Sequence, residues 1–340
     1  MIQQWYRFGP TTIAVTAGNM QQHARVHERW LPLFQVQPLV APAGVPLRLR
    51  LVDAPPPVVP AAVELFRYGA IQVRQTAGHF HLSCGDSWLD IAVAQMSATG
   101  RIAADFADYG LAEQREFFQL LFLLLLRRQG YYVLHANAVL PPQPLPHDPQ
   151  AGVLLIGDCG AGKTTLTLSL LQAGWRCVGD DLVILDGAQD GTVMAHGLRR
   201  GFSCTPETAL TFPALQTLLA EGRDLVRSKK FVSAETLYPA QFVPHCTPRL
   251  LLFPTIAPDA QSAVTTLTAR DALERLLSQP RAGILVDPPT VNGHLQIYGK
   301  LVNQAAAGEF RAGQDVLTGP LAVGARLEQF LTRAMKCIYE

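Results

Sequence analysis

The chain has 340 residues, of which 49% are hydrophobic and 16% charged, a composition typical of a folded globular protein and not of a disordered one. This length predicts a large core and two domains. The formal net charge of +1 lacks the basic excess of nucleic-acid-binding proteins, so no nucleic-acid partner is expected. Six cysteines lie far apart without a CxxC pair, which argues against a disulfide framework or a zinc site.

The first residues, "MIQQWYRFGP", show no basic segment followed by an apolar run, so no signal peptide is expected. The most apolar stretch, Phe117 to Leu126, is shorter than the ~20 residues that a membrane span needs. We interpret this stretch as a buried helix, and we expect no membrane partner and a cytoplasmic location.

Residues 1–110 are predicted to form a β-rich N-terminal domain. Segments such as "TTIAVTAG", "PLRLRLVDA" and "AIQVRQTAGHFHLSCG" alternate apolar and polar residues between Gly, Pro and Asp breaks, which is typical of half-buried strands. Hairpins are expected around Gly78 and around Gly100. The sequence indicates no role for this domain.

A helix from about Leu111 to Gln129 opens the second predicted domain, residues 111–340. After it, "YYVLHANAVL" predicts a strand, "PPQPLPHDPQ" a proline-rich surface turn, and "AGVLLIG" a buried strand. The helix "TTLTLSLLQAG" follows, with Gly174 at its C-terminal end, and then the strands "WRCVG" and "LVIL". Strand, glycine loop, helix and strand make up the βαβ unit of a P-loop fold.

A glycine-rich segment between the buried strand and the helix matches G-x-x-x-x-G-K-[ST] at every defined position. In such a loop the backbone amides and the helix N-terminus bind phosphate oxygens, Lys163 reaches the β/γ-phosphates, and the Thr164 hydroxyl holds Mg²⁺. Cys159 is interpreted as a small residue whose backbone does the binding, although a redox-sensitive thiol is the other reading. ATP and Mg²⁺ are therefore the predicted cofactors. The predicted nucleotide-binding residues are Gly157, Asp158, Cys159, Gly160, Ala161, Gly162, Lys163, Thr164 and Thr165.

Two adjacent acids, Asp180 and Asp181, end the segment "WRCVGDD". One carboxylate near a phosphate loop completes the oxygen shell of Mg²⁺, and a second is free to accept a proton from an attacking hydroxyl. Two acids that cap a turn are the simpler interpretation, but the nearby phosphate loop argues against it.

The run "GVLLIGDCGAGKTTLTLSLLQAGWRCVGDDLVIL" resembles the catalytic domain of the HPr kinase/phosphorylase family, in which a phosphate loop is followed by a helix and by a strand that ends in Asp-Asp. Looser similarity includes "LHANAV", "RSKKFVSAETLYPAQFVP" and "RLLLFPTI", so it covers roughly residues 130 to 260. The resemblance implies an α/β P-loop domain that is HPr kinase-like and PEP carboxykinase-like. By position it implies that Asp180 is the acid/base residue, and that Asp181 and Thr164 are metal ligands. It also implies that His135 lies near the phosphates, whereas a lone histidine is as often a core residue.

A basic cluster later in the chain is a candidate lid over the γ-phosphate, although a solvated charged face is the simpler interpretation. The phosphorylase members of the family carry Glu-x-Arg-Gly after the Asp pair. Here "HGLRRGFSCTPE" has Arg199, Arg200 and Gly201 but no Glu at the matching place, which favours a kinase over a phosphorylase. The residues of the candidate lid are Arg227, Lys229 and Lys230.

The predicted function is ATP- and Mg-dependent transfer of the γ-phosphate to a serine-type hydroxyl of a protein or peptide, with Asp180, Lys163 and His135 as catalytic residues. A small-molecule hydroxyl kinase and a non-catalytic ATP-binding regulatory module stay open. The sequence contains no NKxD guanine motif, which favours ATP over GTP. The acceptor and the oligomeric state, a homo-oligomer included, also stay open.

Overall fold

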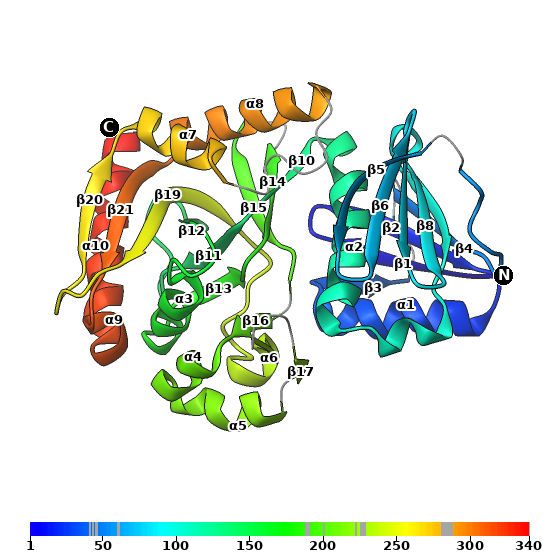
Figure 1. Ribbon diagram of the computed structural model, residues 1–340. Coiled ribbons are helices and arrows are strands. Elements are labelled where there is room, and N and C mark those ends of the chain that lie inside the picture. Colours follow the sequence, from blue (N-terminus) through cyan, green and yellow to red (C-terminus); the bar gives the residue numbers. More distant parts are fainter. Residues whose placement is uncertain are drawn as a thin grey trace. The chain divides into compact units, whose positions relative to one another are not determined.

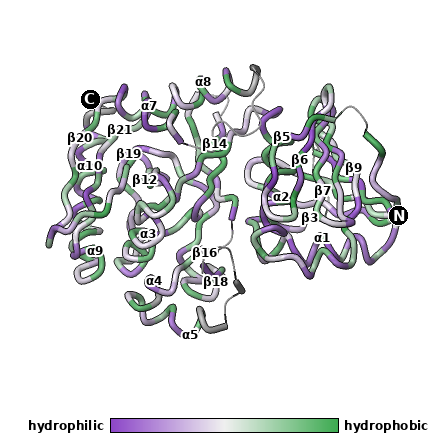
Figure 2. Tube along the Cα trace, in the orientation of Figure 1, coloured by the Kyte–Doolittle hydropathy of each residue, from purple (hydrophilic) through white to green (hydrophobic). Residues whose placement is uncertain are grey.

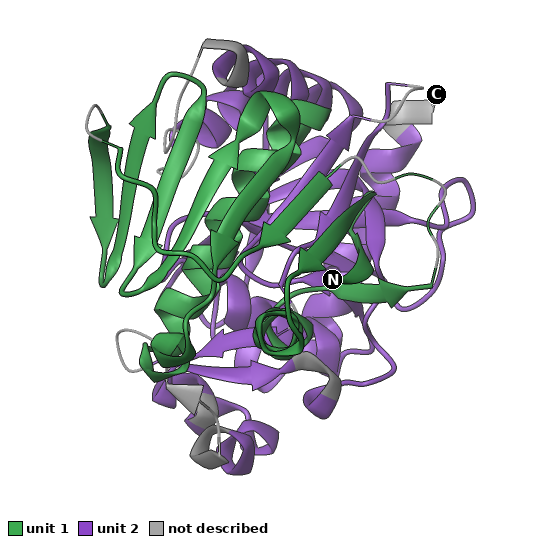
Figure 3. Cartoon of the chain, turned by 90° about the vertical axis from the view of Figure 1, so that its right-hand side faces the viewer, with its two compact units in different colours: residues 1–131, 223–227 green, residues 132–222, 228–340 purple. Residues whose placement is uncertain are grey.

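A computed structural model divides the chain into two compact units (Figure 1, Figure 3). Unit 1 comprises residues 1–131 and 223–227, and unit 2 comprises residues 132–222 and 228–340. The structure describes residues 1–40, 42, 44, 47–59, 62–187, 191–199, 201–221, 223–224, 229–279 and 288–339. None of the described helices combines the length and the hydrophobicity that crossing a bilayer requires.

Unit 1 contains a nine-stranded mixed sheet in the order β3-β1-β2-β4-β9-β8-β7-β6-β5. Buried and more exposed residues alternate along its strands, for example along β7, and Figure 2 colours the chain by the hydropathy of each residue. The strands are β1 (Ile2–Phe8), β2 (Thr11–Ala17), β3 (Val36–Leu39), β4 (Leu47–Leu51), β5 (Val63–Tyr68), β6 (Ile71–Thr76), β7 (His79–Cys84), β8 (Ser87–Ala92) and β9 (Ser97–Arg101). The helices are α1 (Met20–Leu33) and α2 (Leu111–Leu126), with short 3-10 turns at Val93–Gln95, Ala104–Asp108 and Arg127–Gln129.

The long apolar helix predicted from Leu111 is present as α2, but the structure assigns it to unit 1 and not to the second domain. The ring of Phe122 lies 4.0 Å from that of Phe8, 4.9 Å from that of Trp30 and 5.2 Å from that of Phe34. The helix therefore completes the core of unit 1, and the division falls after Tyr131 and not at residue 110.

The structure of unit 1 differs from the sequence expectations at two further points. Helix α1 was not predicted, because its segment is rich in polar residues; its buried side chains, among them Val26 and Trp30, follow a helical spacing, and Asn19 caps its start. Gly100 lies inside β9 and not in a hairpin turn. A Cβ at Gly100 would lie 2.2 Å from the carbonyl oxygen of Trp88, so close packing explains this glycine. The hairpin expected around Gly78 is confirmed between β6 and β7.

Phe122→Ala should destabilise unit 1 by about 3–5 kcal/mol, because a fully buried ring that contacts three other aromatic rings would leave a cavity. Urea denaturation followed by tryptophan fluorescence measures this change in the free energy of unfolding. The control is Leu65→Ala, whose side chain is partly exposed. Equal effects of the two substitutions would contradict the place of α2 in this core.

Unit 2 is built on a second nine-stranded sheet with the main order β10-β14-β15-β19-β12-β11-β13, in which β21 pairs with β19 and β20. The strands of this sheet are β10 (Tyr131–Leu134), β11 (Ala136–Leu140), β12 (Ala151–Ile156), β13 (Arg176–Gly179), β14 (Val183–Gly187), β15 (Val193–Gly197), β19 (His245–Ile256), β20 (Ala263–Leu267) and β21 (Ala306–Ala312). Strands β16 (Gly201–Cys204) and β18 (Lys230–Ser233) pair antiparallel outside it. The helices are α3 (Lys163–Gln172), α4 (Pro206–Thr211), α5 (Pro213–Glu221), α6 (Ala234–Leu237), α7 (Ala269–Leu277), α8 (Pro288–Gln304), α9 (Asp315–Thr318) and α10 (Pro320–Tyr339). The short strand β17 (Arg223–Asp224) precedes β18 in the chain.

The predicted order of strand, glycine loop, helix and strand is present as β12, α3 and β13. Strand β12 is completely buried and runs parallel to β19. Strand β11 lies between β12 and β13 and is antiparallel to both, so β12 and β13 run parallel without being neighbours. The segment predicted as one strand before the loop is two strands, β10 and β11, with His135 at the bend between them.

Candidate functional site

The candidate site lies where β12 ends and α3 begins. The connecting residues 157–162 form a loop in which Gly160 and Gly162 have φ values of +92° and +88°. Residues other than glycine rarely adopt this left-handed backbone conformation, which explains why glycine occupies both positions. Helix α3 has no acidic residue in its first turn, so its N-terminal amides and its dipole are available to an anion. A loop of this geometry at a helix N-terminus can bind an anion.

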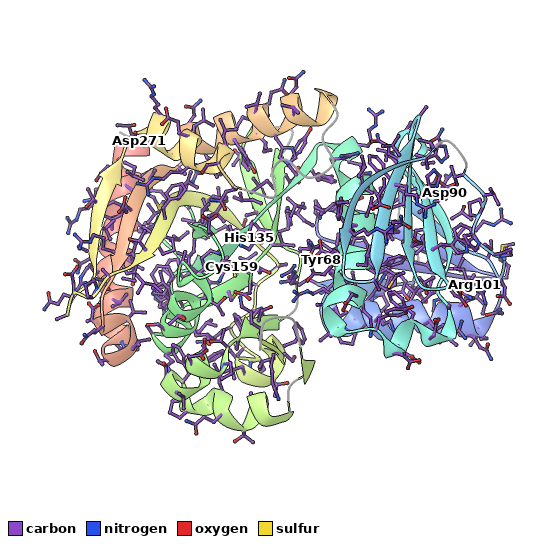
Figure 4. The ribbon with its side chains drawn as sticks, in the orientation of Figure 1. Tyr68, Asp90, Arg101, His135, Cys159 and Asp271 are labelled. Atoms are coloured by element: carbon purple, nitrogen blue, oxygen red, sulfur yellow. The ribbon has the colours of Figure 1, made fainter. Side chains whose placement is uncertain are left out.

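Lys163, the first residue of α3, is folded back over this loop. Its Nζ donates to the carbonyl oxygens of Gly157 at 2.6 Å and Asp158 at 3.0 Å, and lies 3.1 Å from His135 Nε2 (Figure 4 labels His135 and Cys159). The lysine is 7% exposed, and burial lowers its pKa to about 8, while the charge of Asp180 acts in the opposite direction. Because an ammonium group only donates, His135 Nε2 is the acceptor in this contact.

Asp180 is buried and accepts hydrogen bonds from three donors. Thr164 Oγ1 donates to its Oδ1 at 3.0 Å, Asn137 Nδ2 donates to the same oxygen at 2.7 Å, and the backbone amide of Ser203 donates to Oδ2 at 3.3 Å. These donors compensate for the loss of water at a carboxylate that is 1% exposed. The resemblance paired Thr164 with Asp181, whereas the hydrogen bond of the Thr164 hydroxyl goes to Asp180.

Asp181 has a different environment from its neighbour. Its side chain is 22% exposed, its Oδ1 lies 3.0 Å from His135 Nδ1, and its Oδ2 forms an ion pair with the buried Arg199. Its φ of +69° is a left-handed conformation that asparagine and aspartate tolerate better than most residues, and such backbone often occurs at functional sites. Lys163, His135, Asp181 and Arg199 thus form one continuous chain of polar contacts.

Asn137 was missed by the sequence analysis, although it joins the two aspartates. This fully buried amide donates to Asp180 Oδ1 and to Thr167 Oγ1, and its own oxygen accepts from the backbone amide of Asp181 at 2.8 Å. A lone amide in the apolar strand "ANAVL" was the available signal, because a buried polar group needs partners. Arg199 was noted only as part of an Arg-Arg-Gly run.

Asn137→Ala should lower the free energy of unfolding of unit 2 by about 1–3 kcal/mol, because it removes one of the two donors to Asp180 Oδ1 and the side-chain acceptor of the Asp181 backbone amide. Asn137→Asp should cost more, since it places a second carboxylate beside Asp180. Thermal and urea denaturation measure both losses. The exposed Asn303 on α8 provides the control, Asn303→Ala. An Asn137→Ala protein as stable as that control would contradict the role of Asn137 in joining the two aspartates.

The predicted basic lid is only partly described. Lys229 Nζ lies 3.5 Å from Cys159 Sγ, so the structure brings this lysine to the glycine loop. Lys230 is half-buried at the start of β18. Arg227 lies outside the described residues, and so does Arg200.

The donor atoms around Thr164 fit a magnesium ion. Among the described residues, no three His, Cys, Asp or Glu side chains gather into a metal site. Mg²⁺ in nucleotide sites needs only one or two carboxylates, because phosphates and water fill its octahedron. Thr164 Oγ1 and Asp180 Oδ1 lie 3.0 Å apart, which matches the ~2.9 Å edge of an octahedron with Mg–O bonds of about 2.0–2.1 Å.

Comparisons with known proteins add little to this geometry. No family model matches the chain, and no curated protein matches its sequence. Among solved structures it is similar to the Hpr(Ser) kinase/phosphatase from Coxiella burnetii, with 15% sequence identity over 58% of this chain and 97% of that chain, and a TM-score of 0.28.

Proposed function

We propose that the chain is a kinase that uses ATP and Mg²⁺ to phosphorylate a serine-type hydroxyl of a protein or peptide. The observation that carries this proposal is the pair of adjacent carboxylates beside Lys163. Asp180 is buried against Thr164, and the more exposed Asp181 contacts His135. A protein that only binds a nucleotide needs one such carboxylate, whereas phosphoryl transfer uses a second group to accept the proton of the hydroxyl.

Binding of the triphosphate would use the loop amides and the N-terminus of α3. Lys163 would exchange the carbonyl oxygens of Gly157 and Asp158 for phosphate oxygens, since a buried ammonium gains more from anionic partners. Thr164 and Asp180 would hold Mg²⁺, which neutralises the phosphate charge when it is bound. Lys229, next to Cys159, would add a further positive charge at the open side of the loop.

The transfer itself would use the pair of Asp181 and His135. Asp181 faces His135 Nδ1, so the ring is oriented with Nε2 as the acceptor, and Nε2 becomes available when Lys163 moves to the phosphates. The hydroxyl oxygen bonds to the γ-phosphorus, the bond from that phosphorus to ADP breaks, and the hydroxyl proton passes to His135 Nε2. These roles of the two aspartates are the reverse of those that the sequence resemblance implies.

The test of the proposal combines binding with transfer. Calorimetry measures ATP affinity, and γ-labelled ATP is then incubated with a library of serine-containing peptides and, separately, with a panel of small hydroxyl compounds. We expect label on peptides. Label only on small compounds would favour the small-molecule kinase, and ATP binding without any transfer would favour the regulatory module. A chain that binds no ATP would refute the proposal.

Transfer and tight ATP binding should both require Mg²⁺, because the ion would join the phosphates to the oxygens of Thr164 and Asp180 and neutralise the phosphate charge. Phosphate release from γ-labelled ATP, measured with and without EDTA, should stop when the metal is removed. Full turnover in EDTA would exclude metal-assisted transfer.

ATP should also be preferred to GTP in a competition experiment, since the sequence has no guanine motif. Use of GTP alone would exclude the assignment of ATP.

A further inference from the structure

The sheet of unit 1 has one apolar face and one polar face. Cross-strand pairs place Leu49, Ala98 and Ile91 in one row of the buried face. The neighbouring row faces the other way and consists of Arg50, Thr99, Asp90, His81 and Arg74, which pair in turn across β4, β9, β8, β7 and β6. Helices α1 and α2 cover the apolar face, because Trp30 and Phe122 pack on Tyr6 and Phe8 from that side.

Arginines dominate the polar face, while its acids are already engaged. Asp53 pairs with Arg101, Glu64 with Arg67, and Asp90 with His79 and His81 (Figure 4 labels Asp90 and Arg101). Arg48 and Arg50 lie on β4, exposed and on the same side of the strand. Neither forms an ion pair within the described ranges. The centre of the face therefore carries two positive charges that the described part of the chain does not balance.

We propose that this face binds an acidic polypeptide segment in an extended conformation. Arg48 and Arg50 are two residues apart on one strand, so their side chains leave the sheet about 6.8 Å apart. Acidic residues at every second position of an extended peptide have the same spacing. Each carboxylate can accept two hydrogen bonds from one guanidinium, which makes arginine better suited than lysine to such a pair.

A polypeptide fits this face better than a nucleic acid does. Proteins that bind single strands combine basic residues with exposed aromatic rings on which bases stack. Two tryptophans lie on the same face: Trp88 is 7% exposed and its Nε1 donates to the carbonyl oxygen of Ala54 at 3.0 Å, and Trp5, in the row of Arg48, is half-buried. Thr99, the cross-strand partner of Arg50, supplies a hydroxyl suited to peptide groups. The proposal rests on unit 1 alone and does not depend on the function proposed for unit 2.

The experiment measures peptide binding to the full chain by fluorescence anisotropy at low salt, where exposed charges are least screened. Two labelled peptides of about twelve residues, ~40 Å when extended, have the same composition: one alternates Glu and Ser, and the other has a Glu block followed by a Ser block. The alternating peptide should bind more tightly, because only it presents carboxylates at the spacing of the two arginines. Equal affinity for the two peptides, or no binding, would overturn the proposal.

The double variant Arg48→Gln/Arg50→Gln should weaken binding of the alternating peptide by about tenfold or more. The control variant Arg270→Gln/Arg333→Gln removes the same charge from two exposed positions of unit 2 and should bind like the wild type. If the first variant does not fold, Arg48→Lys/Arg50→Lys keeps the charge, loses the paired donors and should still bind more weakly. Equal losses in the variant and its control would overturn the proposal, as would tighter binding of oligouridine than of the alternating peptide.

Discussion

Asp181→Asn should leave ATP·Mg²⁺ binding close to that of the wild type but slow phosphoryl transfer by about 10²–10⁴-fold, the usual effect of losing a positioned proton acceptor. The substitution keeps the size of the side chain but removes the charge that faces His135 Nδ1. His135 and Arg199 then each lose their charged contact with Asp181. The measurement is calorimetry of ATP binding beside the rate of phosphate release from γ-labelled ATP, with water as the acceptor.

Asp180→Asn should give the opposite pattern. The Asp180 carboxylate accepts a hydrogen bond from the Thr164 hydroxyl, at the proposed position of the metal ion. Removing the carboxylate charge should therefore raise the Mg²⁺ concentration that ATP binding requires, and transfer should fall together with binding. The exposed Asp86 of unit 1 provides the control, Asp86→Asn, which should change neither quantity. If Asp181→Asn raised the magnesium requirement and Asp180→Asn lost only transfer, the roles implied by the sequence resemblance would be correct.

The second large effect is expected for Lys163→Ala, which should weaken ATP binding by about 100-fold or more. The ammonium group is the buried cation of the loop, and two charge-assisted hydrogen bonds to phosphate would be lost with it. The fold should persist, because Lys163 contacts loop carbonyls and a histidine and lies outside the apolar core clusters of unit 2.

Calorimetric titration with ATP and a thermal denaturation curve check both parts of this expectation. Lys300→Ala, at an exposed position on α8, is the matched control and should bind ATP like the wild type. An unchanged ATP affinity of the Lys163→Ala protein would remove the phosphate loop from the proposed function.

The regular parts of the candidate site could be predicted because their signals are local. Gly160 and Gly162 are needed where the backbone has positive φ, and the helix begins at the residue after the second of them. The two aspartates follow a short strand, as expected. In unit 1 the alternating pattern predicted a β-rich domain and several of its strands, whereas α1 was missed because its polar surface hides a narrow apolar stripe.

The sequence by itself determined the glycine loop, the helix after it and the presence of two acids nearby, since these depend on residues close together in the chain. Only the tertiary structure decided which acid meets Thr164 and which meets His135. Asn137 reaches Asp180 across 43 positions of sequence, and the Lys163–His135 contact spans 28. Such partners are chosen by the pairing of β11 with β12 and β13, because strand pairing fixes which side chains share an edge of the sheet. No local pattern carries that information.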